Sequence, residues 1–145
     1  IIKTGKEPKS WKESAYYHYW MHMLALDNPG HIAVRAKHHK LIYFYGAYEN
    51  KAEAGTPPGW ELYDLDNDPK EMNNAIDHPE YKTEVKELKD ELARLRKAYK
   101  EDDPKYKCNQ VIDRYWDYTE ADRKEAIEIS KRYKAAIESG EIIRK

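Results

Sequence analysis

The chain has 145 residues, of which 37% are charged and 40% are hydrophobic, and its formal net charge is −1. That length fits one domain with a modest core, and the high share of charge fits long solvated helices. Because the charges nearly cancel, no overall field attracts the chain to nucleic acid or anionic lipid, so neither nucleic acid nor a membrane is expected as a partner. No apolar run approaches the roughly 20 residues of a membrane span.

Four short segments in the first half of the chain are predicted to be strands, because they are dense in Tyr, Trp, Ile and Val. Residues 37–39 form a short connection that predicts a hairpin between the second and third of them. Breaker residues at 27–30 and 55–59 separate the others, and the polar residues 46–54 are expected to form an exposed loop. The predicted strands are residues 15–23, 31–37, 40–45 and 60–65.

The second half of the chain has helical spacing. Apolar residues 3, 4, 3 and 4 positions apart form one stripe that predicts a helix over 79–100. A second helix is predicted over 107–116, and a third over 119–139 with the Thr119 hydroxyl capping the amides near Asp122. Strands followed by helices indicate an α+β fold, in which packing of the first helix on the sheet is favoured over a coiled coil. The stripe consists of Val85, Leu88, Leu92, Leu95 and Tyr99.

Three alternating aspartates, Asp64, Asp66 and Asp68, invite comparison with a calcium-binding loop. The loop would need Gly at its sixth position and a bidentate Glu at its twelfth, which are occupied by Pro69 and Ala75. The favoured interpretation is a strand end followed by a Pro-fixed turn, in which the Asp side chains cap backbone amides.

Two histidines, His18 and His22, have the spacing of a helical zinc pair, but Tyr19 stands where a metalloprotease has its Glu. In a strand, residues four apart are about 13 Å from each other and cannot share one ion. The single cysteine, Cys108, has no neighbouring base that would activate it. The sequence therefore predicts neither a metal site nor a catalytic residue in this chain.

His31 and Arg35 are the candidate substrate-binding residues. They lie four apart in a predicted strand, so they share one face, and an imidazole and a guanidinium can together bind an anionic or hydroxylated group. The alternative is a histidine at a strand edge and an arginine paired with a carboxylate. The 13 Tyr and 4 Trp residues likewise suit either sugar stacking or the core of a sheet, and the core is favoured.

Two sequence blocks resemble the C-terminal subdomain of formylglycine-dependent (type I) sulfatases. Segment 59–74 contains Glu-Leu-Tyr-Asp-Leu, two further residues, Asp-Pro, and then Glu and Asn. The second block, 31–35 followed by 40–45, stands where that family has a strand pair. The family strand reads His-Tyr-Gly-Ile-Arg-Thr or similar, and this chain keeps its His and Arg as His31 and Arg35. The resemblance covers residues 5–100.

The resemblance implies an antiparallel sheet of about four strands packed by a long helix over residues 1–102. Residues 103–145 extend past the ordinary end of the family, and their spacing predicts a helical C-terminal extension. It implies that the chain is the part of a sulfatase that contributes to the substrate pocket, in an enzyme that hydrolyses sulfate esters of a sulfated glycan. His31 becomes a sugar or sulfate contact, with Arg35 the more structural of the two. The family's formylglycine and calcium would belong to a catalytic domain upstream, which would be the chain's partner, and the family is usually periplasmic or secreted.

Two other functions stay open on the sequence. No Cys/Ser-x-Pro-x-Arg motif, the source of formylglycine, occurs in the 145 residues. The chain is therefore expected to be inactive alone, and it is alternatively a free-standing interaction or carbohydrate-binding module with the same fold. A third hypothesis is a structural protein that oligomerises through residues 79–139.

Overall fold

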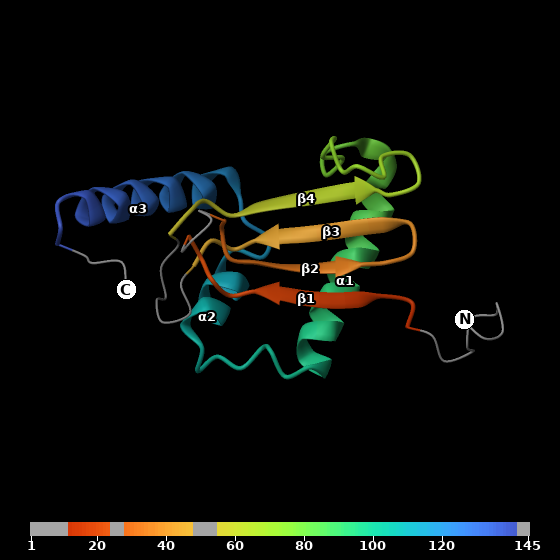
Figure 1. Ribbon diagram of the computed structural model, residues 1–145, viewed down its shortest axis with the longest axis horizontal. Helices are drawn as coiled ribbons and strands as arrows, with labels where there is room; N and C mark the ends of the chain where they lie inside the picture. The colour runs from red at the N-terminus through yellow and green to blue at the C-terminus, as the bar shows by residue number, and fades with distance from the viewer. Residues whose placement is uncertain (1–11, 24–27, 48–54, 142–145) are drawn as a thin grey trace.

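A computed structural model describes residues 12–23, 28–47 and 55–141 of the chain (Figure 1). In this described part the elements are four strands, a short 3₁₀ helix and three α-helices, so the α+β prediction is confirmed. The strands are β1 (Ala15–Tyr19), β2 (His31–Arg35), β3 (His39–Phe44) and β4 (Gly59–Asp64). The helices are η1 (Pro79–Tyr81), α1 (Lys82–Ala98), α2 (Lys107–Arg114) and α3 (Glu120–Glu138).

The strands form one antiparallel sheet in the order β1-β2-β3-β4, as expected. The predicted hairpin is present, with Arg35 opposite Lys40 at the turn and His31 opposite Phe44 at the far end. Each strand therefore pairs with its neighbour in the chain.

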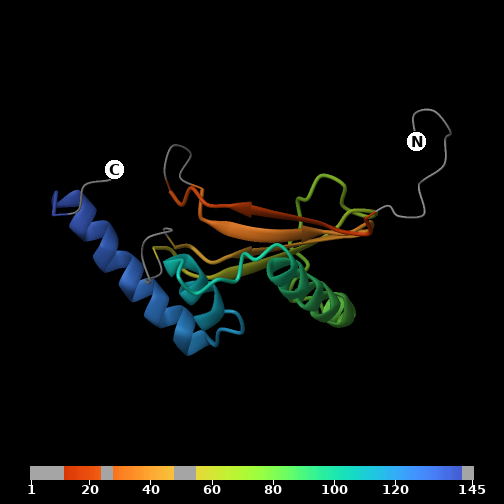
Figure 2. The ribbon, with the colours of Figure 1, turned by 90° about the horizontal axis from the view of Figure 1, so that it is seen from below.

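Side chains alternate between two faces of the sheet. One face, here called the core face, packs on the helices, which all lie on that side (Figure 2). The other, here called the open face, has no helix over it in the described part of the chain. The core face consists of Tyr16, His18, Ile32, Val34, Leu41, Tyr43, Trp60 and Leu62. The open face consists of Tyr17, Tyr19, His31, Ala33, Arg35, Lys40, Ile42, Phe44, Glu61 and Tyr63.

Helix α1 covers the core face with the apolar stripe predicted for it. Leu88, Leu92 and Leu95 are buried there, and burial of one leucine stabilises the fold by about 1.5–3 kcal/mol. Tyr99 is 47% exposed, although its ring stacks on Tyr16 of the core face with centroids 5.8 Å apart. The helix has ended by then, because Lys100 takes a left-handed conformation with φ of 60° and turns the chain away.

Helices α2 and α3 belong to the same core as the sheet. Cys108, Val111 and Ile112 of α2 join the buried cluster, as does Ala126 of α3. The predicted cap at the start of α3 is confirmed, since the Thr119 hydroxyl accepts a hydrogen bond from the Asp122 amide. The division of the chain at residues 102 and 103 stays a prediction.

The first predicted strand is too long. It ends at Tyr19 rather than at residue 23, because Tyr19 pairs with His31, the first residue of β2, and β2 offers no further residue with which 20–23 could pair. The predicted exposed loop is also wrong at its start, where Gly46 and Ala47 are buried, while residues 48–54 lie outside the described part. None of the described helices is both long and apolar enough to span a bilayer.

Candidate functional site

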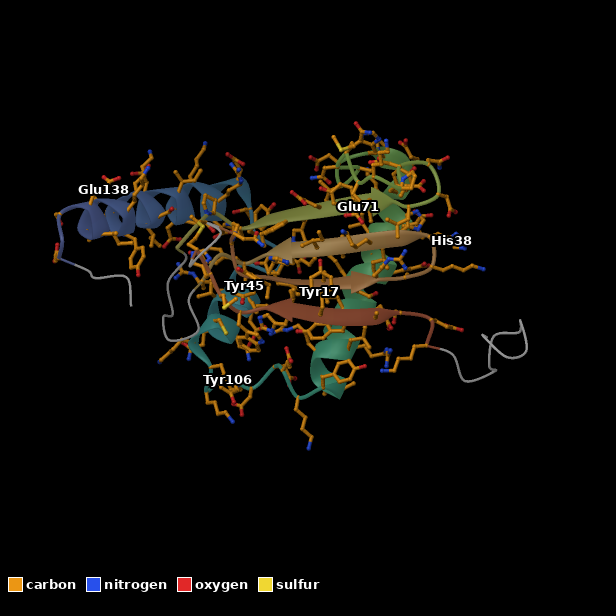
Figure 3. All side chains as sticks on the ribbon, viewed as in Figure 1. Tyr17, His38, Tyr45, Glu71, Tyr106 and Glu138 are labelled. Atoms are coloured by element: carbon orange, nitrogen blue, oxygen red, sulfur yellow. The ribbon has the colours of Figure 1, made fainter. Side chains whose placement is uncertain are left out.

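His31 lies at one end of the open face, surrounded by aromatic rings. Its side chain is mostly buried, with the whole residue 9% exposed. The Tyr19 ring stacks on the imidazole with centroids 5.2 Å apart, Phe44 lies at 5.0 Å, and Tyr17 meets it edge-on at 5.8 Å. Figure 3, viewed from the open side, shows Tyr17 near the middle of this face. The three rings fix the orientation of the imidazole.

The hydrogen bond of His31 determines which of its ring nitrogens carries the proton. Nδ1 lies 2.8 Å from the Pro29 carbonyl oxygen, which can only accept, so Nδ1 carries the hydrogen and Nε2 is the acceptor nitrogen. Burial lowers the pKa of His31, and Lys40 acts in the same direction, although the Pro29 carbonyl and Glu61 oppose them. The ring is therefore neutral at pH 7.

Charges of both signs lie on the open face, from its middle at Glu61 to the turn end at Lys40. Lys40 forms an ion pair with Glu71, and its ammonium lies 5.4 Å from the centre of the Tyr63 ring. The Tyr63 hydroxyl donates to Glu61 at 2.8 Å, and partial burial together with this carboxylate raises the pKa of Tyr63 to about 12. This part of the face is therefore polar but nearly balanced in charge.

Arg35 lies on the same face as His31 but at the opposite end of β2. Four residues of strand separate their Cα atoms by about 13 Å. Between them lies Ala33, which is fully buried, and Arg35 itself is exposed. The structure thus brings His31 together with aromatic residues, whereas Arg35 lies at the other end of the strand.

The alternating aspartates form a turn, as the sequence predicted. The Asp64 carboxylate accepts from the backbone amides of Asp66 and Asn67 at 3.0 and 3.1 Å, and from the Tyr81 hydroxyl at 2.7 Å. Hydrogen bonds from Asn67 and Tyr81 lower the pKa of Asp64. Asp68 similarly accepts from the Asn73 amide at 2.8 Å.

His18 and His22 do not meet. His18 is on the core face with Glu101 and Tyr45, whereas His22 Nδ1 accepts from the Gly30 amide at 3.0 Å. Within the described ranges no group of three or more His, Cys, Asp or Glu side chains is placed to hold a metal ion. Cys108 is fully buried in the core.

The sequence interpretation missed the aromatic surroundings of His31. Tyr17 and Tyr19 share its face because they stand opposite Ala33 and His31, and Phe44 pairs with His31 across the hairpin. Strand alternation would have found these residues once the registers of β1 with β2 and of β2 with β3 were known.

Comparisons with known proteins agree with this fold. The family described as N-sulphoglucosamine sulphohydrolase, C-terminal, matches residues 1–98. A curated N-acetylglucosamine-6-O-sulfatase of Bacteroides thetaiotaomicron is 37% identical over 104 residues, which cover 72% of this chain and 17% of that protein. The chain therefore spans about a sixth of the length of this relative.

A solved structure is also similar. It is described as a complex with its substrate, D-glucosamine-2-N,6-O-disulfate, and it aligns with a TM-score of 0.59 at 37% identity. The alignment covers 69% of this chain and 18% of the solved chain. The family match, the identity to a sulfatase and the shared fold lead to one conclusion: this chain belongs to the family of sulfatase C-terminal domains represented by N-sulphoglucosamine sulphohydrolase.

Proposed function

We propose that the chain is the substrate-contacting C-terminal part of an enzyme that hydrolyses sulfate esters of a sulfated glycan. The observation that carries the proposal is His31, a neutral histidine oriented by three aromatic rings on a sheet face without a covering helix in the described part of the chain. The described relatives act on sulfated glucosamine, which supports this class of substrate. In this proposal the open face meets the catalytic domain encoded upstream.

The protonation of His31 limits what it can contact. Its Nε2 is an acceptor, and the oxygens of a sulfate ester are acceptors too, so these two groups do not hydrogen-bond to each other. A sugar hydroxyl or N–H group can donate to Nε2. His31 is therefore proposed to bind the sugar ring rather than its sulfate, and Arg35, about 13 Å along the strand, would reach only a more distant part of a longer glycan.

The chemical step is assigned to the upstream domain. Formylglycine and calcium are proposed to belong to that domain, as the family resemblance implies, and the role proposed for this chain is to bind and orient the sugar. A periplasmic or secreted location is proposed on the same ground.

The test compares two histidines in a protein that joins this chain to its upstream reading frame. His31→Ala is expected to lower kcat/KM for a sulfated glucosamine by about tenfold or more, the worth of one hydrogen bond to a buried group. The control is His38→Ala, because His38 lies on the turn at the other end of the sheet with a side chain 53% exposed. Equal activity of the His31→Ala variant and the wild type would contradict the proposal.

A second candidate function is a free-standing carbohydrate-binding module. The observation that favours it is Tyr17, which is 39% exposed on the open face beside His31 and has the shape to stack on a sugar. The isolated chain would then bind sulfated oligosaccharides with micromolar affinity in calorimetry. A flat titration would remove this candidate.

A further inference from the structure

Tyr45 lies behind His31, on the core side of the sheet, and contacts the end of β1 and the residue directly before β2. Its backbone amide donates to the Gly30 carbonyl at 3.1 Å, directly before His31. Its ring lies so close to Gly30 that a Cβ atom there would be 3.0 Å from the ring carbons. Its hydroxyl lies 3.3 Å from the carbonyl oxygen of Tyr19, the residue whose ring stacks on His31. Figure 3 shows Tyr45 at this end of the sheet.

The Tyr45 hydroxyl has a second partner in His18. The distance from this oxygen to His18 Nε2 is 2.8 Å, and His18 Nδ1 lies 2.7 Å from the Glu101 carboxylate. A carboxylate accepts hydrogen bonds, so Nδ1 carries the hydrogen and Nε2 accepts from Tyr45. The imidazole is 3% exposed, and the Trp20 ring stacks on it with centroids 3.5 Å apart. His18 is therefore held from both nitrogens and from one face.

Glu101 is fixed in turn by the end of α1. Its amide donates to the Arg96 carbonyl at 2.9 Å, across the left-handed Lys100. The Tyr16 hydroxyl also donates to its carboxylate at 2.8 Å. One continuous set of hydrogen bonds thus runs from the end of α1, through the core face, to Tyr45, whose amide bonds the Gly30 carbonyl directly before His31. Because the Tyr45 hydroxyl gives its single hydrogen to His18, it meets the Tyr19 carbonyl oxygen as a contact only.

We propose that Glu101, His18 and Tyr45 are positioning residues for His31, a relay that fixes the ends of β1 and β2 from the core side. None of the three reaches the open face, so they act only through the backbone and through the Tyr19 ring. A side chain that contacts substrate is effective only when its position is fixed to within a fraction of an ångström. The relay is proposed to fix the position of His31 in this way. That this positioning improves substrate binding rests on the proposed function of His31. That the relay positions His31 does not rest on it.

The first test is nuclear magnetic resonance of the chain with ¹⁵N-labelled histidine, which gives signals from only six residues. The Tyr45→Phe variant removes one hydroxyl and keeps the ring. His31 is expected to change its tautomer signals, and its titration midpoint should rise toward the ordinary value of about 6.5 as its surroundings loosen. His31→Ala identifies the signal.

The matched control is Tyr43→Phe. Tyr43 lies on β3, two residues before Tyr45, is likewise fully buried, and has a hydroxyl without a hydrogen-bond partner in the described structure. Its loss should leave the His31 signals unchanged.

At the other end of the relay, Glu101→Gln keeps an acceptor for His18 and should behave like the wild type, while Glu101→Ala should behave like Tyr45→Phe. If His31 is unchanged in both Tyr45→Phe and Glu101→Ala, the relay is overturned.

The second test is kinetic and separates this inference from the proposed function. In the longer protein, Tyr45→Phe is expected to raise KM about threefold to tenfold, with Tyr43→Phe near the wild type. Unchanged turnover in His31→Ala defeats the proposed function, but the magnetic resonance result would still decide the relay. A large effect of His31→Ala with no effect of Tyr45→Phe or Glu101→Ala on either readout defeats the relay alone.

Discussion

The two faces of the sheet use the same strands for different purposes. On the core face, Ile32, Val34 and Leu41 are fully buried under the helices. On the open face, Ala33 and Ile42 form a buried floor, but the residues around them are aromatic or charged. Because neighbouring residues of a strand point to opposite faces, one sequence can assign stability to alternate positions and ligand contact to those in between. Substitutions should therefore affect folding on the core face and binding on the open face.

The largest expected effect is on the core face. Leu92→Ala should lower the free energy of unfolding by about 2–5 kcal/mol, because Leu92 is fully buried and its loss leaves a cavity. The open-face counterpart, Tyr17→Ala, should cost about 1 kcal/mol, the value of one aromatic contact. Urea unfolding followed by tryptophan fluorescence measures both. Equal losses in the two variants would break the distinction between the faces.

The buried His18 should make the core face sensitive to acid. Burial lowers the pKa of His18 to about 4, although Glu101 opposes the shift. The unfolded chain, with a pKa near 6.5, then binds more protons than the folded chain between these values. The stability is complete above about pH 6.5 and falls by about 3 kcal/mol as the pH drops to 4.

His18→Asn should flatten this pH profile, as shown by urea midpoints at pH 7 and pH 4.5. The pKa of His31 is lowered as well, so a smaller slope of the same sign should remain. A slope as steep as that of the wild type would show that His18 is not the group that titrates.

The ion pair on the open face should contribute modestly. Lys40 and Glu71 have side chains 15% and 33% exposed, so their attraction is only partly screened. A double-mutant cycle with Lys40→Ala and Glu71→Ala should give a coupling energy of up to about 1 kcal/mol, weakened by added salt. A coupling of several kcal/mol would mean that the open face carries folding energy like the core face.

The smallest effect on stability is expected at Arg35. Because Arg35 is exposed, Arg35→Ala should change the free energy of unfolding by no more than about 0.5 kcal/mol. If the proposed function holds, the same variant should raise KM for a longer glycan in the enzyme and leave KM for a monosaccharide unchanged. A raised KM for both substrates would place Arg35 closer to the reacting sugar than β2 allows.

Local signals in the sequence were enough to predict most of the architecture. Gly and Pro separated the strands, the leucines at 88, 92 and 95 predicted α1, and Thr119 predicted the start of α3. The end of β1 was missed because it depends on where its partner begins, at His31. The burial of Gly46 was missed for a similar reason, since it packs against Thr56, beyond the loop.

The candidate site was predictable only in part. His31 was proposed from its spacing and from the family resemblance and stays a prediction, whereas its ring contacts required the registers of β2 with β1 and with β3. The hydrogen bond between His18 and Glu101 joins residues 83 positions apart, and no local pattern specifies it. Sequence reasoning finds the residues of one strand more readily than the contacts that tertiary folding creates.

The core continues beyond the stretch that matches the family. The match ends at residue 98, but Trp116 lies edge-on to Trp60 at 4.9 Å and Tyr115 is almost completely buried. A polypeptide cut at that limit would expose the Tyr43 and Trp60 rings, which stack on each other at 4.3 Å, as an apolar patch. Such a product would be prone to aggregation, so the length chosen for expression decides whether this subdomain is obtained in soluble form.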